Sequence, residues 1–246
     1  MTASEAARKN WRDLKGRPIK EIIEHIVTYY GFSAFLIGVL VVSALGYLIH
    51  VLTLKDEVLN VNCMGPVSVQ SGAEIFANDF AEYAGINLDQ CEVNISTSLS
   101  SVENNAEGSY ESVEVLTALI ASQAVDIIAA DIQYLTPHMY QNYFADLSKI
   151  LSAEQMEAYG ESFLYVDMEV VRQIKNTKLP EEMPEYPDPT KPETMSEPVP
   201  VAIRLSESVS FVKQFFLKNE GHTAIAFAVN AKNLDNARAF LEFIHQ

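Results

Sequence analysis

The sequence predicts an α/β protein in which a single N-terminal transmembrane helix precedes one three-layer lobe with a mainly parallel sheet. Two observations predict this class. Residues 25–54 contain no Asp, Glu, Lys or Arg, and after them short apolar runs alternate with amphipathic runs. Strands that alternate with helices usually pair in parallel through right-handed crossovers. The 246 residues suffice for one domain of ordinary size with appendages, but not for two large domains.

The apolar run is predicted to be a membrane anchor. Residues 31–54 would form a helix of roughly 36 Å, which is enough to cross a hydrocarbon layer of about 30 Å. The alternative, a cleaved signal peptide, is disfavoured because thirty residues precede the run and no A-x-A site follows it. Residues 1–30 would then be a basic and amphipathic segment on the cytoplasmic side.

The charges that flank the anchor predict its orientation. Lys55 is the only basic residue between the run and Lys149, whereas six basic residues precede the run: Arg8, Lys9, Arg12, Lys15, Arg17 and Lys20. Basic flanks stay in the cytoplasm, so we expect a single-pass protein of the cytoplasmic membrane with residues 56–246 outside. The lipid bilayer is therefore the first expected partner, through residues 31–54.

Hydrophobic periodicity predicts the elements of the outer domain. Strands are expected at 58–64, 92–97, 125–131, 163–171, 201–205 and 223–230, and helices after Ser71 and at 110–123, 206–219 and 233–245. The last helix would bury Ala237, Phe240, Leu241 and Ile244. Seven prolines and six acidic residues between Pro180 and Pro200 predict an exposed, poorly packed excursion at about 180–200 that interrupts the domain.

Two segments resemble extracellular solute-binding proteins of the type II periplasmic-binding fold. Residues 125–151 are similar to that family's segment of a buried strand ending in Asp, a helix and an "ADLS" turn; their sequence is VDIIAADIQYLTPHMYQNYFADLSKIL. Residues 223–244 are similar to the family's strand, "-N-" turn and helix; their sequence is TAIAFAVNAKNLDNARAFLEFI. The resemblance implies a solute-binding lobe that serves an ABC transporter. Because residues 56–246 are too few for two lobes, the chain resembles a truncated, membrane-anchored, one-lobed relative.

Candidate site residues follow from the predicted parallel strands. Ligands bind at the carboxyl ends of such strands, which selects Gly65, Ser68, Thr97 and Asp131 as ligand-binding candidates. Asp167 and Glu169 would share one face of the strand at 163–171 and could act as a carboxylate pair, although a solvated strand face is favoured. Residues 56–148 contain 14 Asp or Glu and no Lys or Arg, a pattern typical of a solvated acidic face that would attract cations or basic peptides.

Motifs for catalysis are absent from the sequence. It contains no phosphate-binding glycine loop, HExxH helix or GxSxG elbow, so we expect no cofactor, no metal and no enzymatic activity. The net charge of -16 also disfavours nucleic-acid binding. The leading hypothesis is a binding or adaptor module beside an ABC-type transporter. The alternative is a structural or signalling interaction protein of the cell envelope that keeps the fold without a solute.

The two cysteines provide a test of strand register. Cys63 would lie near the carboxyl end of the first strand and Cys91 at the amino end of the second. Neighbouring parallel strands would hold these residues well beyond the ~7 Å that a disulfide tolerates between α-carbons. We therefore predict two free thiols, although a disulfide is the simpler expectation for two cysteines outside the cytoplasm.

Overall fold

The computed structural model describes residues 18–64, 72–99, 108–176, 184–216 and 222–246. The predicted site residues Gly65 and Ser68 lie outside these described residues. The chain divides into two compact units, residues 1–54 and residues 55–246, and each unit is described by itself.

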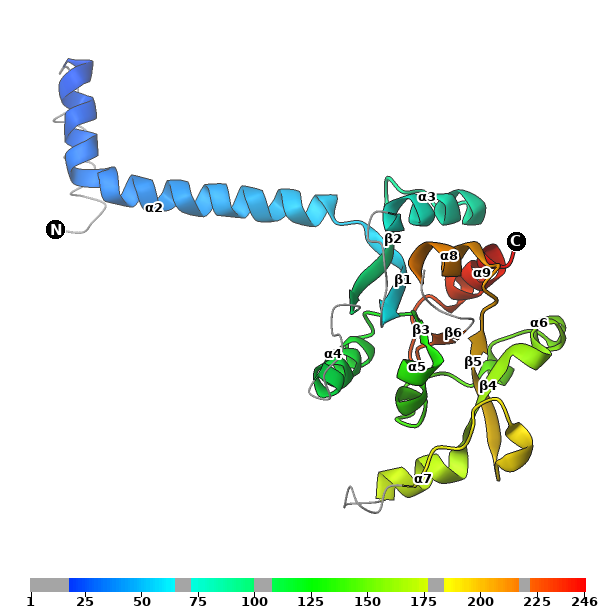
Figure 1. The fold of residues 1–246 in the computed structure, drawn as a ribbon. Helices are drawn as coiled ribbons and strands as arrows, with labels where there is room; N and C mark the ends of the chain where they lie inside the picture. Colours follow the sequence, from blue (N-terminus) through cyan, green and yellow to red (C-terminus); the bar gives the residue numbers. More distant parts are fainter. Residues whose placement is uncertain (1–17, 65–71, 100–107, 177–183, 217–221) are drawn as a thin grey trace. The chain divides into compact units, whose positions relative to one another are not determined.

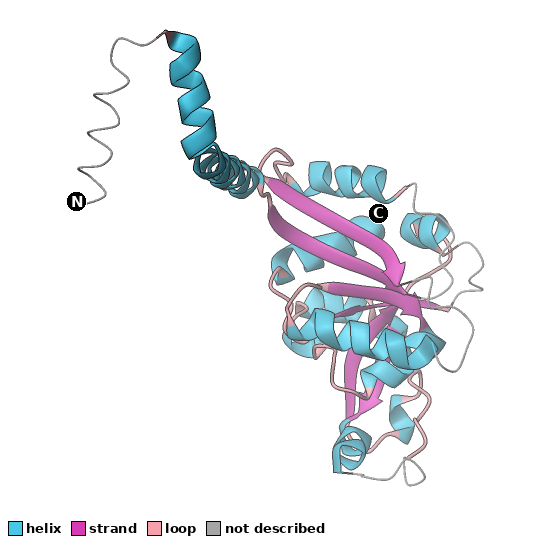
Figure 2. Ribbon diagram, turned by 90° about the vertical axis from the view of Figure 1, so that its left-hand side faces the viewer, coloured by secondary structure: helices cyan, strands magenta, loops and turns pink. Residues whose placement is uncertain are grey.

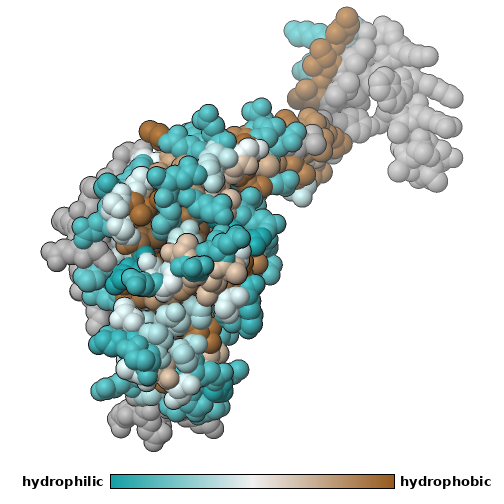
Figure 3. All heavy atoms as spheres, turned by 90° about the vertical axis from the view of Figure 1, so that its right-hand side faces the viewer, coloured by the Kyte–Doolittle hydropathy of each residue, from teal (hydrophilic) through white to brown (hydrophobic). Residues whose placement is uncertain are grey.

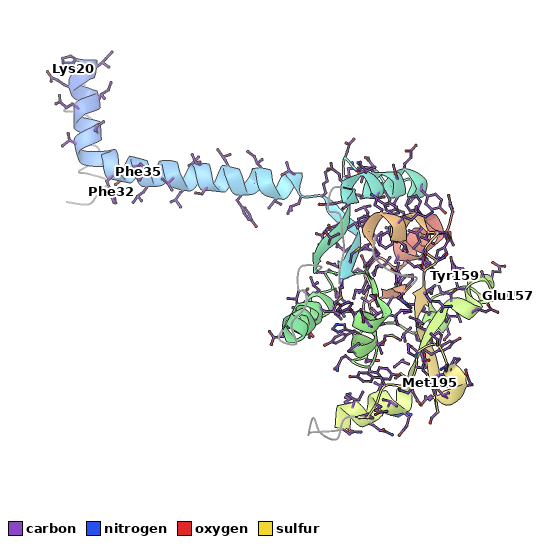
Figure 4. The ribbon with its side chains drawn as sticks, viewed as in Figure 1. Lys20, Phe32, Phe35, Glu157, Tyr159 and Met195 are labelled. Atoms are coloured by element: carbon purple, nitrogen blue, oxygen red, sulfur yellow. The ribbon has the colours of Figure 1, made fainter. Side chains whose placement is uncertain are left out.

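The first unit contains helix α2, Ile19–Thr53. Within it, Gly31–Ile49 is the one helical stretch among the described residues that is long and apolar enough to cross a membrane, and none of it is buried within the protein. Phe32 and Phe35, labelled in Figure 4, are 76% and 66% exposed. The described chain therefore leaves the apolar surface of α2 uncovered.

The second unit is built on a six-stranded sheet with the order β2-β1-β3-β6-β5-β4 (Figure 1). The strands are β1 Asp56–Met64, β2 Cys91–Leu99, β3 Ile127–Asp131, β4 Phe163–Asp167, β5 Pro198–Arg204 and β6 Thr223–Phe227. β1 lies between β2 and β3 and pairs with both in parallel, so that Asn62 stands opposite Ser96 on one side and Ile128 on the other. The prediction of a mixed α/β domain is confirmed.

The prediction of a mainly parallel sheet is wrong, because β6 is antiparallel to β3, β5 to β6 and β4 to β5. Helix α8, Ser210–Phe215, lies between β5 and β6 in the chain. β6 starts at the edge of the sheet where β5 ends, and the Leu205 N–H donates to the Thr223 carbonyl at 2.8 Å.

Helices cover both faces of the sheet (Figure 2). Helices α3 (Ala73–Ala84), α8 and α9 (Leu234–Ile244) contribute to the core on one face, and α4 (Gly108–Ala121), α5 (Ile132–Met139) and α7 (Met168–Asn176) to the core on the other. Successive residues of β3 point alternately into the two cores, as a strand covered on both faces requires. The four inward positions predicted for the last helix are all buried in α9.

The first core is rich in phenylalanine. The Phe76 ring of α3 lies 5.6 Å from the ring of Phe211 in α8 and 6.2 Å from the ring of Phe240 in α9, between centroids. Helix α3 ends at Gly85, which adopts a φ of 67°, a left-handed conformation that glycine reaches without a steric cost. This turn releases the chain toward β2.

Most of the described residues 184–200 of the proline-rich segment are exposed, as predicted, but backbone hydrogen bonds tie the segment to β4 and to the start of α7, so it is not poorly packed. The Tyr165 N–H of β4 donates to the Pro189 carbonyl at 2.8 Å, and the Met168 N–H donates to the Glu197 carbonyl at 3.0 Å. Met195, labelled in Figure 4, is only 9% exposed. The segment therefore lies along β4 and is bonded to it.

The prolines of β5 occupy a part of the strand that tolerates them. Pro198 and Pro200 pair with β4, whereas the pairs between β5 and β6 involve only Ala202, Ile203 and Arg204. Proline cannot donate to a second neighbouring strand, so it is accepted where only one neighbour is present. A strand therefore forms at a place where the proline count predicted none.

Cys63 and Cys91 are free thiols, as predicted. Cys91 stands opposite Asp56, seven residues before Cys63 along β1. Seven residues of strand span ~23 Å, far beyond the reach of a disulfide. Burial also raises the pKa of the Cys63 thiol, so this side chain is an unreactive part of the core.

Candidate functional site

The carboxyl ends of the three parallel strands meet at one edge of the sheet, where the sequence predicts a ligand site. Met64 at the end of β1 stands opposite Leu99 of β2 and Ala130 of β3. Of the four predicted site residues, only Thr97 and Asp131 belong to the described part of the chain. They lie on strands that β1 separates, and neither lines any of the pockets described below.

Asp131 has a structural role at this edge. It is the N-cap residue of α5, and its carboxylate accepts the Gln133 N–H at 3.0 Å. A capping carboxylate satisfies a backbone N–H that the helix itself leaves without a partner. Thr97 is 8% exposed in β2, so it too is part of the packed sheet rather than an open surface.

The favoured expectation of a solvated strand face that carries Asp167 and Glu169 is wrong, and so is the alternative of a carboxylate pair on that face. β4 ends at Asp167 and α7 begins at Met168, so Asp167 and Glu169 do not share a strand face. The Asp167 carboxylate is 4% exposed and accepts the backbone N–H groups of Glu169 at 3.0 Å, Ser196 at 2.7 Å and Glu197 at 3.1 Å. Burial alone would raise its pKa, but the three hydrogen bonds outweigh burial and lower it. Asp167 therefore clamps the proline-rich segment onto β4.

Glu169 belongs to an exposed ion-pair network. Its carboxylate lies 2.9 Å from the Arg172 guanidinium, which also pairs with Glu197 of the proline-rich segment. Hydrogen bonds from Arg172 and Gln173 are the chief reasons that the pKa of Glu169 is lowered. Neither carboxylate is thus placed as a general acid, which needs a raised pKa.

A pocket of about 530 Å³ lies beside this network, between the end of α5 and α7. Its lining residues are Tyr140, Gln141, Asn142, Met168, Val171, Arg172, Ile174 and Lys175. Tyr140 is 1% exposed, its ring stacks on Tyr186 with centroids 4.7 Å apart, and its hydroxyl has no hydrogen-bond partner among the described residues. Burial is the chief cause of the raised pKa of Tyr140. The phenol is therefore a neutral group in the wall of the pocket.

A second, more apolar pocket of about 490 Å³ shares Asn142 and Met168 with the first. Aliphatic side chains dominate it, including Val166 and Val201 from the sheet. The rim carries Asp146, Lys149 and Glu197, of which Asp146 and Lys149 form an ion pair at 3.0 Å. Such a hollow suits apolar groups.

A third hollow, of about 530 Å³, lies between α6 (Ala153–Ala158) and α9, beside the labelled Tyr159 in Figure 4. Gln155 donates across it to the Glu242 carboxylate at 2.8 Å. Figure 3 shows this side of the protein as mostly hydrophilic, with small hydrophobic areas. The bonded side chains across the hollow make it a helix contact rather than a ligand cavity.

His138 is a buried histidine of α5. It is 4% exposed, its Nδ1 has no partner among the described residues, and burial lowers its pKa to about 4. Its ring stacks against Tyr143 at 6.1 Å between centroids. The imidazole is therefore neutral near neutral pH. The described residues also contain no group of three or more His, Cys, Asp or Glu that could hold a metal ion.

Sequence reasoning gave no role to Asp126, a buried carboxylate that accepts more than one hydrogen bond from distant segments. It is 2% exposed, and its two oxygens accept four hydrogen bonds of 2.9 to 3.0 Å from the Asn60, Lys232 and Asn233 N–H groups and the Asn233 side-chain amide. Asp126 thus joins β1, β3 and the turn before α9. The signal in the sequence is a lone acidic residue at the start of an apolar strand.

Comparisons with known proteins identify no relative. The chain matches no family model, no curated protein and no solved structure. The architecture therefore defines a class only: a mixed α/β domain that follows one apolar helix. The resemblance to solute-binding proteins stays a prediction.

Proposed function

We propose that this chain is a membrane-anchored, non-catalytic binding or adaptor module, with α2 in the cytoplasmic membrane and residues 56–246 outside it. The observation that carries the proposal is the uncovered apolar surface of Gly31–Ile49. Burying one Leu, Ile, Val or Phe side chain contributes roughly 1.5–3 kcal/mol of free energy, and each such side chain of this helix would lose that stabilisation in water. A bilayer removes these side chains from water. It offers no hydrogen bonds to the backbone, but a helix needs none, because its N–H and C=O groups are paired with one another.

Membrane fractionation of the full chain tests the anchor. We expect the protein in the membrane fraction, resistant to alkaline carbonate and released by detergent. Replacing Leu36, Leu40 and Val42 with lysine should move it to the soluble fraction, because each lysine near the centre of a spanning helix costs about 2.5–3.5 kcal/mol.

A control introduces three lysines at exposed positions of the second unit, as Glu154→Lys, Glu157→Lys and Glu161→Lys, a change of net charge that is larger than in the test variant. This control should stay in the membrane. Release of the unaltered protein by carbonate would show that α2 does not span the bilayer. Digestion of an N-terminal tag by protease added to intact spheroplasts would overturn the proposed orientation.

The non-catalytic binding or adaptor role is supported by the structural roles of three aspartates of the domain. Asp126, Asp131 and Asp167 are all bonded to backbone N–H groups, so each holds the fold together. Residues 55–246 form one compact unit, which is the expectation for a one-lobed module. A module without a second lobe contacts partners with its surface, and tethering raises the effective concentration of a partner in the same membrane.

The second candidate function is an envelope interaction protein that keeps the fold without any solute. The same compactness of residues 55–246 favours it, because a solute clamp needs two lobes. Crosslinking and pulldown of the intact protein from membranes separates the two functions. Recovery of ABC-transporter subunits supports a transporter adaptor, whereas recovery of other envelope proteins alone supports the second function.

A further inference from the structure

The two edge strands of the sheet differ in how the chain treats them. At β4, the proline-rich segment bonds to the outer side of the strand through the Pro189 carbonyl. At the opposite end of the order, β2 has one neighbour, β1, and no other strand pairs with it in the described part of the chain. In a parallel pair, alternate residues of a strand direct their N–H and C=O groups away from the neighbour. β2 is therefore able to accept a further strand.

The first half of β2 carries one charged side chain, Glu92, and its pairing with β1 is irregular next to that residue, between Glu57 and Leu59. Residues 91–95 contain no lysine and no proline, which commonly prevent an edge strand from pairing with another chain. Glu92 and Asn94 are exposed, whereas Val93 and Ile95 are buried in the first core. The strand is thus anchored by its inner side chains. The Cys91 N–H donates to the Asn87 carbonyl at 2.9 Å, so the part of the edge without a described backbone partner begins after Cys91.

A groove of about 570 Å³ follows the same stretch of β2, between the strand and α3. Its apolar lining is Ala73, Ala77, Leu88, Val93 and Ile95, and its polar lining includes Glu74, Asn78, Glu92 and Asn94. Strand addition takes its affinity from main-chain hydrogen bonds and its specificity from pockets for alternate side chains. The edge of β2 offers the main-chain groups, and the groove offers the pocket for side chains.

The acidic side chains beside the groove indicate the charge of its partner. No ion pair of the described residues involves Glu74, Glu92 or any other acidic side chain between 56 and 131. The only cation at the groove is Lys55, whose ammonium donates to the Leu88 carbonyl. Acidic side chains without cationic partners attract a basic segment. A second copy of this chain, with a net charge of -16, would be repelled.

We propose that residues 92–95 of β2 bind an extended, basic segment of a partner protein as an added strand, with apolar side chains of that segment in the groove beside α3 and its lysine or arginine side chains on the opposite face, near Glu92. This inference names the partner surface of the proposed adaptor and so rests on that proposal.

The test uses the full chain in detergent and a nine-residue peptide in which lysine alternates with valine, labelled for fluorescence anisotropy. A second peptide carries an N-methyl group on every backbone nitrogen. It keeps its charge, but in neither register can it donate the main-chain hydrogen bonds of an added strand. We expect the first peptide to bind. We expect the N-methylated peptide, and the double variant Glu74→Lys with Glu92→Lys, to weaken binding by at least about tenfold.

The matched control variant, Glu154→Lys with Glu157→Lys, changes the net charge equally on α6 and should bind like the unaltered protein. Absence of binding by the first peptide would overturn the proposal. So would equal binding of the N-methylated peptide, which would show charge attraction without strand addition. A dimer in analytical ultracentrifugation that the peptide dissociates would assign the edge to a second copy. Because the assay is done in detergent, failure of the membrane anchor leaves its outcome unaffected.

Discussion

The edge of the sheet at β4 is closed by the chain itself, whereas no strand of the described residues pairs with the outer edge of β2. At β4, Asp167 holds Ser196 and Glu197 through their N–H groups, and Arg172 links α7 to Glu197. At β2, acidic side chains have no cationic partners among the described residues. The comparison shows that composition misleads about order: the proline-rich segment protects one edge, whereas at the other edge a proline-free strand has a single neighbouring strand among the described residues.

The largest expected effect lies at the centre of the sheet, and it tests whether the two edges belong to one cooperative unit. Asp126→Ala would leave up to four buried N–H donors without an acceptor. Unsatisfied buried donors cost about 1–3 kcal/mol each, so we expect a loss of roughly 3–5 kcal/mol. Denaturant unfolding followed by circular dichroism measures this loss.

Asp131→Ala is the matched control, since it removes a single capping bond and should cost about 1 kcal/mol. Hydrogen exchange in the Asp126→Ala variant then sharpens the comparison. Equal loss of protection at β2 and β4 means one cooperative unit. Loss confined to one edge would separate the two halves of the sheet.

The next effect concerns the closed edge alone. Asp167→Asn removes a charged acceptor that holds three N–H groups, and we expect it to cost about 2–3 kcal/mol. Hydrogen exchange should rise in the proline-rich segment and at Tyr165, but not along β2. Glu161→Gln, at an exposed carboxylate nearby, is expected to leave stability unchanged. Unaltered exchange at Tyr165 in Asp167→Asn would show that the clamp does not hold the edge.

Acidification should open the same edge. The folded-state pKa of Asp167 is lowered below its ordinary value of 3.8, so its contribution to stability is complete above that value and is lost as the pH falls through the lower, folded-state pKa. Stability measured between pH 5 and pH 2 should fall more steeply in the unaltered protein than in Asp167→Asn. Parallel curves for the two proteins would contradict this assignment.

A smaller effect is expected from the aromatic contact of the proline-rich segment. Tyr186→Ala removes the stack on Tyr140, in which the two rings are inclined by 14°, and should cost about 1 kcal/mol. Tyr186→Phe keeps the stacked ring and is expected to be neutral. An equal loss in both variants would assign the stabilisation to the hydroxyl group instead.

The smallest expected effect concerns the thiols. Because Cys63 and Cys91 are far apart in register, reductant should leave the unfolding transition unchanged, and thiol titration of the denatured, unreduced protein should find two reactive groups. A titration that finds none would reveal a disulfide and overturn the parallel register of β1 and β2.

Several features of this protein followed from the sequence by itself. The apolar run of α2, the strand at 58–64, the α9 positions from Ala237 to Ile244 and the free cysteines were all predicted from periodicity and spacing. These features depend on residues close together in the chain, because a helix or strand repeats its inward positions every 3.6 or 2 residues. The meeting of the carboxyl ends of β1, β2 and β3 followed in the same way, from strands that alternate with helices.

Only the tertiary structure decided the directions of β4, β5 and β6, the role of Asp167 and the difference between the two edges. Each of these depends on contacts between distant segments, such as Asp167 with Ser196 or Asp126 with Asn233. Local periodicity carries no information about which segment returns to which edge of a sheet. A carboxylate that looks solvated in the sequence therefore becomes a clamp when a remote backbone brings N–H groups to it, because a buried charge is stable only with such partners.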